Sequence, residues 1–191
     1  MRVLGIWDGH DSGAALVENG VLVAAVNEER FSRRKLEICF PARSIATCLR
    51  LGSVAASDID VVAASTADIA KTIERWFPQT KERYYAIRRR QVSPTVLTRV
   101  TTRLKYRITE WGPTRTSRIL SRVALKQHLR PIGFDDVQLD LHDHHTCHAL
   151  AAAHASGMTS CVAVTVDGLG DGLSATISRF EQGRLERVVA S

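Results

Sequence analysis

Short apolar runs separated by turn residues open the chain. Residues 3–7, 14–17 and 21–26 are mostly apolar, and the pair Asn19-Gly20 stands between the second and the third run. Asn-Gly between apolar runs is among the strongest short signals for a tight hairpin turn. The pattern therefore predicts three strands at the N-terminus.

Helical and irregular segments follow these strands. Pro41 fits the first turn of a helix that would run to about Leu51, and Gly52 fits its end. Residues 59–63 are an apolar run that is typical of a buried strand. Residues 66–130, which several prolines interrupt, are predicted to be mainly helical and irregular.

A strand and a helix come next. Val137, Leu139 and Leu141 alternate with polar residues, as in a half-buried strand. Asp143 is a suitable N-cap for the helix that follows, and Gly157 is a suitable end for it.

The pattern of the N-terminus recurs after this helix. Residues 162–166, 174–180 and 185–189 are predicted strands. An Asp-Gly pair, predicted to turn the chain, follows the first strand of each set, at Asp8-Gly9 and at Asp167-Gly168. The repetition predicts two structurally equivalent halves, of which the second is only begun.

This layout resembles that of the actin, hexokinase and heat-shock ATPase superfamily. The predicted fold is α/β, with a ribonuclease-H-like βββαβα first half and the opening hairpin of a truncated second half. Residues 1–157 would form the first subdomain, with a helical insert at 66–130, and residues 158–191 would begin the second. Backbone N–H groups at such glycine turns can hold phosphate oxygens. The candidates are Gly9, Gly13, Gly168, Gly170 and Gly172.

Composition narrows the class of protein. A chain of 191 residues with 45% hydrophobic content can bury a core. It contains no run of 18 apolar residues, and Asp8 comes too early for a signal peptide. We therefore expect a cytoplasmic protein with no membrane contact.

Positive charge is concentrated in one part of the chain. Residues 71–130 contain 16 Lys or Arg residues against three Glu, with Arg88, Arg89 and Arg90 at the centre. Such a basic insert could face nucleic acid or an acidic partner. We favour a solvated helical surface instead, because no nucleic-acid-binding motif accompanies the charge.

Histidines gather in the predicted helix after Asp143. Five of the seven lie between residues 142 and 154. On a helix, His144 and His148 are four residues apart and share one face. Imidazoles bind zinc, iron and related ions, and Asp167 could add a carboxylate. The pattern predicts a metal site; the alternative is a polar helix start with His144 or His145 as a satisfied surface residue.

Four stretches in this order resemble the O-carbamoyltransferase family, which includes enzymes that act on nodulation factors and on antibiotics. They are GIWDGHDSGAA (5–15), NEERFSRRK with FP (27–35 and 40–41), DHHTCHA (143–149) and VDGLGD (166–171). The resemblance covers about residues 3–64 and 136–190, and the basic insert is outside it. One departure is Leu36, where many members carry a histidine.

The resemblance implies a mechanism. The N-terminal region of the family is similar to tRNA threonylcarbamoyladenosine synthase and binds carbamoyl-adenylate beside a divalent metal (iron, zinc or manganese). A separate YrdC-like domain makes that adenylate from carbamoyl phosphate and ATP. Carried over, His144, His148 and Asp167 are metal ligands, and His10 is the general base for the hydroxyl of a small-molecule acceptor. Gly9, Asp11, Lys35, Gly168 and Gly170 would contact the nucleotide or its carbamoyl phosphate group.

The expected function is therefore that of the N-terminal portion of an ATP-dependent O-carbamoyltransferase. The chain alone is expected to be inactive without the YrdC-like domain in cis or in trans. Two alternatives remain: a catalytically incomplete metal- or nucleotide-binding module, and a nucleic-acid-associated protein related to tRNA modification.

Overall fold

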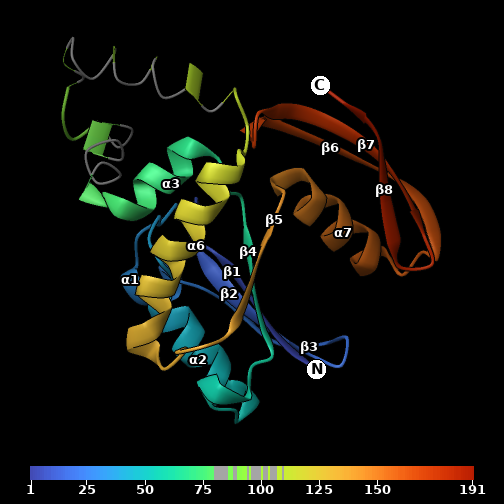
Figure 1. Cartoon of the computed structure of the whole chain (residues 1–191), viewed down its shortest axis with the longest axis horizontal. Coiled ribbons are helices and arrows are strands. Elements are labelled where there is room, and N and C mark those ends of the chain that lie inside the picture. The colour runs from blue at the N-terminus through green and yellow to red at the C-terminus, as the bar shows by residue number, and fades with distance from the viewer. Residues whose placement is uncertain are drawn as a thin grey trace.

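The computed structural model describes residues 1–79, 86–87, 90–93, 95, 100, 103, 107–108 and 110–191 (Figure 1). Arg88 and Arg89, at the predicted centre of the basic insert, lie outside the described residues. Within the described ranges, no helix is both long and apolar enough to cross a membrane.

The larger sheet has five strands in the order β3-β2-β1-β4-β5. These are β1 (Arg2–Trp7), β2 (Gly13–Glu18), β3 (Val21–Asn27), β4 (Val61–Ser65) and β5 (Gln138–His142). The first three strands pair antiparallel, whereas β4 lies parallel to both β1 and β5. The predicted mixed α/β class is confirmed.

The helices that accompany the larger sheet differ in whether they contribute residues to its core. They are α1 (Glu29–Ser32), α2 (Ala42–Gly52), α3 (Ile69–Trp76) and α6 (Arg115–Leu129), with short 3-10 turns at Ala56–Asp58 and Arg130–Ile132. Ile45 of α2 and Leu125 of α6 are fully buried in the same apolar cluster as Leu4 and Val62 of the sheet. The helices α2 and α6 therefore pack against the larger sheet through one shared core.

A second sheet of three antiparallel strands lies beside the first (Figure 1). Its strands are β6 (Ser160–Gly170), β7 (Leu173–Glu181) and β8 (Arg184–Ala190). The helix α7 (His144–Ser156) joins the two sheets in sequence and packs on β6 and β7.

Equivalent turns in the two sets of antiparallel strands have the same backbone conformation, which is consistent with the predicted repeat. Asn19-Gly20 has φ angles of 49° and 82°, and Gln182-Gly183 has 48° and 83°. Asp11 and Asp171, which precede the second strand of each set, also share a left-handed φ, at 56° and 52°. A glycine or a small polar residue adopts this conformation most easily, which explains the composition of these turns.

Two predicted boundaries are corrected. The strand expected at 59–63 begins at Val61, because Asp58 bonds the Ala55 N–H and holds a 3-10 turn in front of it. The turn expected at Asp167-Gly168 is part of β6, and the chain reverses only at Asp171 and Gly172.

Candidate metal centre

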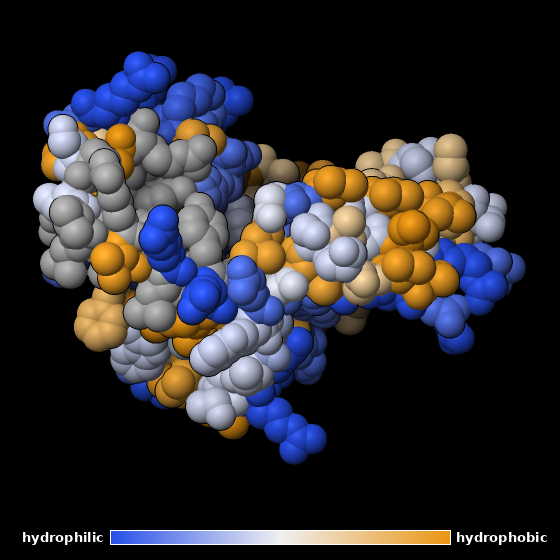
Figure 2. Space-filling model, turned by 90° about the horizontal axis from the view of Figure 1, so that it is seen from above, coloured by the Kyte–Doolittle hydropathy of each residue, from blue (hydrophilic) through white to orange (hydrophobic). Residues whose placement is uncertain are grey.

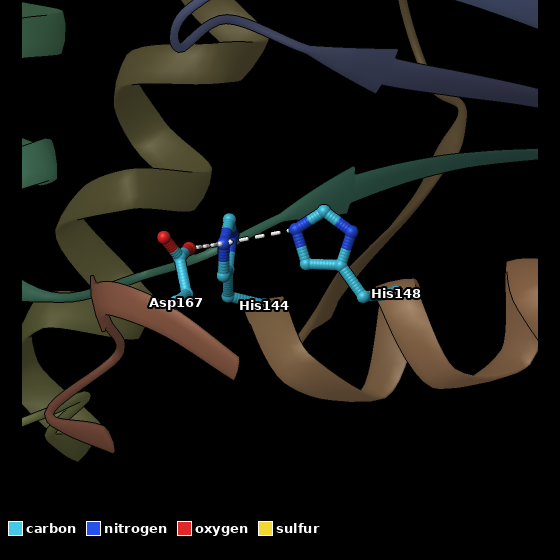
Figure 3. A group of neighbouring side chains, drawn as sticks. All are labelled: His144, His148 and Asp167. Atoms are coloured by element: carbon cyan, nitrogen blue, oxygen red, sulfur yellow. Dashed lines mark hydrogen bonds and ion pairs between the residues drawn. The ribbon is translucent and has the colours of Figure 1, made fainter. Parts of the chain in front are cut away.

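Three side chains predicted to bind a metal converge at the start of α7 (Figure 3). His144 Nε2 lies 2.7 Å from Asp167 Oδ2 and 3.1 Å from His148 Nε2. One ligand atom from each of the three residues lies within 4.8 Å of the others. The structure thus brings together the whole predicted set.

The helix start places the two histidines. Asp143 caps α7 by accepting a hydrogen bond from the Thr146 N–H at 2.8 Å, so that His144 is the first helical residue. Asp143 also contacts Arg187 of β8, which ties the cap to the second sheet. The four-residue spacing then turns His148 toward the same side as His144.

A bulge in β6 places the carboxylate. Val166 pairs with Ala175, and the next pair is Gly170 with Leu173, so three residues of β6 face one residue of β7. Bulges of this kind bend a strand and redirect its side chains, and they are frequent beside functional sites. Here the bulge carries Asp167, whose carboxylate reaches His144.

Close packing fixes the His144 ring. A Cβ at Gly170 would lie 2.3 Å from His144 Cδ2, so only glycine leaves room for the imidazole. On another side the Trp7 ring lies 5.5 Å from the His144 ring, between centroids. Trp7 in turn fills the space that a side chain at Gly9 would take, at 2.0 Å, and donates from Nε1 to the His10 carbonyl at 2.6 Å.

The electrostatics favour the protonation states that bind metals. Burial acts to raise the pKa of Asp167, but hydrogen bonds from His144 and from the Gly168 N–H outweigh it and lower the pKa below its ordinary value. Burial, together with the neighbouring His144, lowers the pKa of His148. An ionised carboxylate and a neutral imidazole, the forms that these shifts favour for Asp167 and His148, are the forms that coordinate a cation.

The donor types suit a divalent ion, and the spacing of His144 to each of the other two ligands is close to that expected around a single ion. Ligand atoms at about 2.1 Å from one ion lie roughly 3.0–3.4 Å from each other in octahedral or tetrahedral arrangements. The 3.1 Å separation between the two imidazole nitrogens falls within that range, and the 2.7 Å contact to Asp167 Oδ2 lies slightly below it. Two nitrogens and one carboxylate oxygen suit zinc, iron or manganese.

Sequence reasoning gave Asp171 no role, although the residue belongs to a matching motif. Asp171 is buried, accepts a hydrogen bond from the His144 N–H at 2.9 Å and contacts Thr66 Oγ1 with its other oxygen. Burial raises its pKa to about 6. The residue joins the start of α7 to the loop after β4.

A buried ion cluster behind the site was also missed. Arg75 Nε lies 2.8 Å and Lys71 Nζ 3.1 Å from the Asp8 carboxylate, and all three side chains are buried. Lys71 Nζ also lies 5.2 Å from the Trp7 ring centroid. Two cations of the basic insert therefore serve the interior of the protein, and only the fold brings them to Asp8.

The alternative in which His145 is a satisfied surface residue is wrong. It is fully buried rather than at the surface, with Nδ1 2.7 Å from Thr165 Oγ1 and Nε2 3.0 Å from the Leu173 carbonyl. His145 thus anchors α7 to the second sheet.

The remaining predicted residues are exposed: His10, Asp11 and Lys35 lie in loops or turns, and Gly168 lies in β6. His10 and Asp11 are exposed on the loop after β1, and the Asp11 carbonyl accepts from Asn27. Lys35 is 86% exposed and pairs with Glu29 at 2.7 Å. Gly168 is exposed, and a Cβ there would meet no atom within 4 Å.

Comparison with known proteins relates the chain to one family. Residues 2–189 match the family model described as "Carbamoyltransferase N-terminus". An uncharacterized protein of Synechocystis is 29% identical, with 85% of this chain and 24% of that protein covered. Nodulation protein NolNO of Sinorhizobium fredii is 30% identical, with 85% of this chain and 20% of that protein covered.

The chain thus spans about a quarter or a fifth of the length of these two relatives. Among solved structures, YeaZ from Pseudomonas aeruginosa aligns with a TM-score of 0.47 at 10% identity, covering 100% of this chain and 66% of that one.

Proposed function

The chain belongs to the carbamoyltransferase family, whose N-terminal part it matches over nearly its whole length, and from this membership we propose that it forms the metal-binding part of an O-carbamoyltransferase active site. The acceptor is the hydroxyl of a small molecule. The observation that carries the proposal is the convergence of His144, His148 and Asp167. A divalent ion held there would act as a Lewis acid on a phosphate or carbamoyl oxygen.

The carbamoyl donor in this proposal is carbamoyl-adenylate. A YrdC-like domain, in cis or in trans, would make it from carbamoyl phosphate and ATP. The lengths of the relatives support this division of labour, because most of NolNO lies outside the region that this chain matches. The strand order β3-β2-β1-β4-β5, with α7 leading to a second antiparallel set, supports an actin/hexokinase-like fold that holds the adenylate between two halves.

The residues of this chain would divide the work. His10, on the exposed loop after β1, would accept the proton of the acceptor hydroxyl. Gly168 lies in the bulge of β6, where a side chain would meet no atom within 4 Å, so its backbone could approach a phosphate. Asp11 and Lys35 would face the nucleotide or carbamoyl phosphate. At Gly9 and Gly170 the space for a side chain is filled by Trp7 and His144, so any phosphate contact would come from the backbone N–H.

Metal binding by single variants tests the site. The parent chain is titrated with Zn²⁺ and with Mn²⁺ by calorimetry, and His148→Ala is expected to bind at least about tenfold more weakly, which is about 1.4 kcal/mol. His142→Ala is the control, because His142 is exposed at the end of β5 and is not in the cluster. Equal affinities of His148→Ala and the parent would contradict the site.

Activity is tested separately. The isolated chain, given carbamoyl phosphate, ATP and a hydroxyl acceptor, is expected to form no carbamoylated product. A full-length NolNO in which this chain replaces the matching region is expected to form it. A chimera that binds the metal but transfers nothing would favour the catalytically incomplete module instead.

A further inference from the structure

Lys71 is a buried cation whose contacts go beyond charge pairing. It lies in the first turn of α3, where Asp68 caps the helix and accepts a hydrogen bond from the Lys71 N–H at 2.7 Å. Arg75 already contacts both carboxylate oxygens of Asp8, at 2.8 and 3.1 Å. One bidentate cation neutralises a carboxylate, and a second buried cation adds a desolvation cost. Charge pairing alone therefore does not account for Lys71.

The ammonium group of Lys71 contacts both the backbone and an aromatic ring at the end of β1. Its Nζ donates to the Asp8 carbonyl at 2.6 Å and lies 3.1 Å from the Asp8 carboxylate. It also lies 5.2 Å from the centroid of the Trp7 ring, within the range of a cation–π contact, which burial strengthens. One side chain of α3 thus restrains the backbone at Asp8 and the face of the indole together.

The indole of Trp7 carries this restraint into the loop after β1. Its six-membered ring fills the side-chain space at Gly9, and its Nε1 donates to the His10 carbonyl at 2.6 Å. A shift of the ring would therefore disturb the backbone at both of these residues. The position of the indole and the course of residues 8–10 are set together.

The same indole contacts the first candidate metal ligand. The centroids of the Trp7 and His144 rings are 5.5 Å apart, and their planes are inclined at 46°. His144 begins α7, which packs on the second sheet, and this sheet forms an arm beside the body that is built on the larger sheet (Figure 2). The ring contact therefore links the end of β1 in the body to the start of α7.

We propose that Lys71 and Trp7 are positioning residues, which hold the loop of the candidate base and the ring of the candidate ligand His144 in one arrangement. In the part of the chain that the structure describes, no hydrogen bond, ion pair or ring contact joins Lys71 to His144, so Lys71 acts through the indole. A base and a metal ion serve one reaction only if their geometry is held to within about 0.5 Å. The proposal rests on the proposed function, from which it takes the roles of His10 and His144.

Nuclear magnetic resonance of the metal-free chain is the first test. The ring current of the indole shifts the signals of the His144 imidazole, because the two rings are in contact. Lys71→Met is expected to move these signals and the His10 amide signal. The imidazole signals of His154, which lies against Phe180, should stay in place. Signals of His144 or His10 that do not move in Lys71→Met would overturn the proposal.

Zn²⁺ affinity in two backgrounds is the second test. In the parent chain, Lys71→Met is expected to weaken Zn²⁺ binding at least about fivefold by calorimetry, because the ligand ring loses its support. In a Trp7→Leu background the same substitution should change the affinity by less than about twofold, because the indole through which it acts is gone. Equal losses in the two backgrounds would show that Lys71 does not act through Trp7 and would contradict the proposal.

A core variant separates positioning from general stability. Ile45→Val shortens a fully buried side chain of the main core, and it should lower the urea midpoint but leave Zn²⁺ affinity within about twofold. Trp7→Leu alone covers the case in which Lys71→Met does not fold, and it should also weaken Zn²⁺ binding at least about fivefold. A loss of affinity in Ile45→Val as large as that in Trp7→Leu would count against a positioning role.

The positioning proposal and the proposed function can fail separately. If the parent chain binds no Zn²⁺ or Mn²⁺, the proposed function fails, and the spectra of the metal-free chain still decide whether Lys71 and Trp7 position His144. If the parent chain binds Zn²⁺ and Lys71→Met matches it in both experiments, the positioning proposal fails and the metal centre stands.

Discussion

At the scale of single residues, the candidate site depends on two glycines, whose lack of a side chain leaves room for aromatic rings. The ring of His144 occupies the space above Gly170, and the ring of Trp7 occupies the space above Gly9. Sequence patterns predicted that these glycines would admit a phosphate. The geometry adds that an aromatic ring fills the side-chain space at each of these glycines, so that the Gly170 and Trp7 contacts restrict the orientation of the His144 ring, while the phosphate contact stays a prediction.

The substitution Gly170→Ala tests this packing. The new methyl group would overlap His144, so the ring must move, and Zn²⁺ affinity measured by calorimetry is expected to fall at least about tenfold. Gly168→Ala is the matched control, since a Cβ there meets nothing within 4 Å. Comparable losses in both variants would show that His144 is not held by this contact.

The residues of the candidate site differ in how far sequence could predict them. His144 and His148 follow from local helical spacing, because Asp143 fixes where the helix begins. Asp171 and the pair of Lys71 with Asp8 depend on contacts between distant segments, for which the sequence has no periodic signal.

At the scale of elements, strand and helix ends were predictable where a turn residue fixes them. Gly157 ends α7, and Asn19-Gly20 joins β2 to β3, as expected. The bulge at Asp167 was not predictable, because it arises from the register between β6 and β7 and not from the composition of either strand.

The ion cluster that joins β1 to α3 has a measurable effect on stability. Asp8→Asn would leave Arg75 and Lys71 buried without their carboxylate, and breaking a buried pair typically costs about 3–5 kcal/mol. Urea unfolding should show that loss. Glu18→Gln, at a partly exposed pair with Arg2, should cost less than about 1 kcal/mol. A loss at Asp8 as small as that at Glu18 would mean that the cluster does not hold β1 to α3.

At the scale of the whole molecule, the two sheets meet at Asp171. It contacts Thr66 after β4 and His144 at the start of α7, and the backbone of Gly112 packs against the same turn. The mixed α/β class and the repeated strand sets could be predicted from the chain. How the sets face each other could not, because it depends on contacts between distant segments, among them those of Asp171 and the close approach of Gly112 to Gly172.

Removal of the Asp171 carboxylate is expected to weaken the contact between the start of α7 and the loop after β4. Asp171→Ala leaves the His144 N–H without its partner, at about 1–3 kcal/mol for a buried group, whereas the Thr66 hydroxyl keeps its 3.3 Å hydrogen bond to Asp68. Chemical unfolding gives the loss, and hydrogen exchange at His144 should become faster. Asp135→Ala, on the exposed surface, should alter neither. Unchanged exchange at His144 in Asp171→Ala would place the junction elsewhere.

Because Trp7 packs against His144, its fluorescence should report which ion is bound beside it. Trp76 and Trp111 are 40% and 74% exposed, whereas the Trp7 indole lies against the His144 ring and below the Lys71 ammonium. An open-shell ion such as Mn²⁺ or Fe²⁺ on His144 would quench the emission of this indole, while closed-shell Zn²⁺ would leave it bright. Fluorescence of the unmodified chain would then distinguish the ions that compete for the centre, and Trp7→Phe would remove the response.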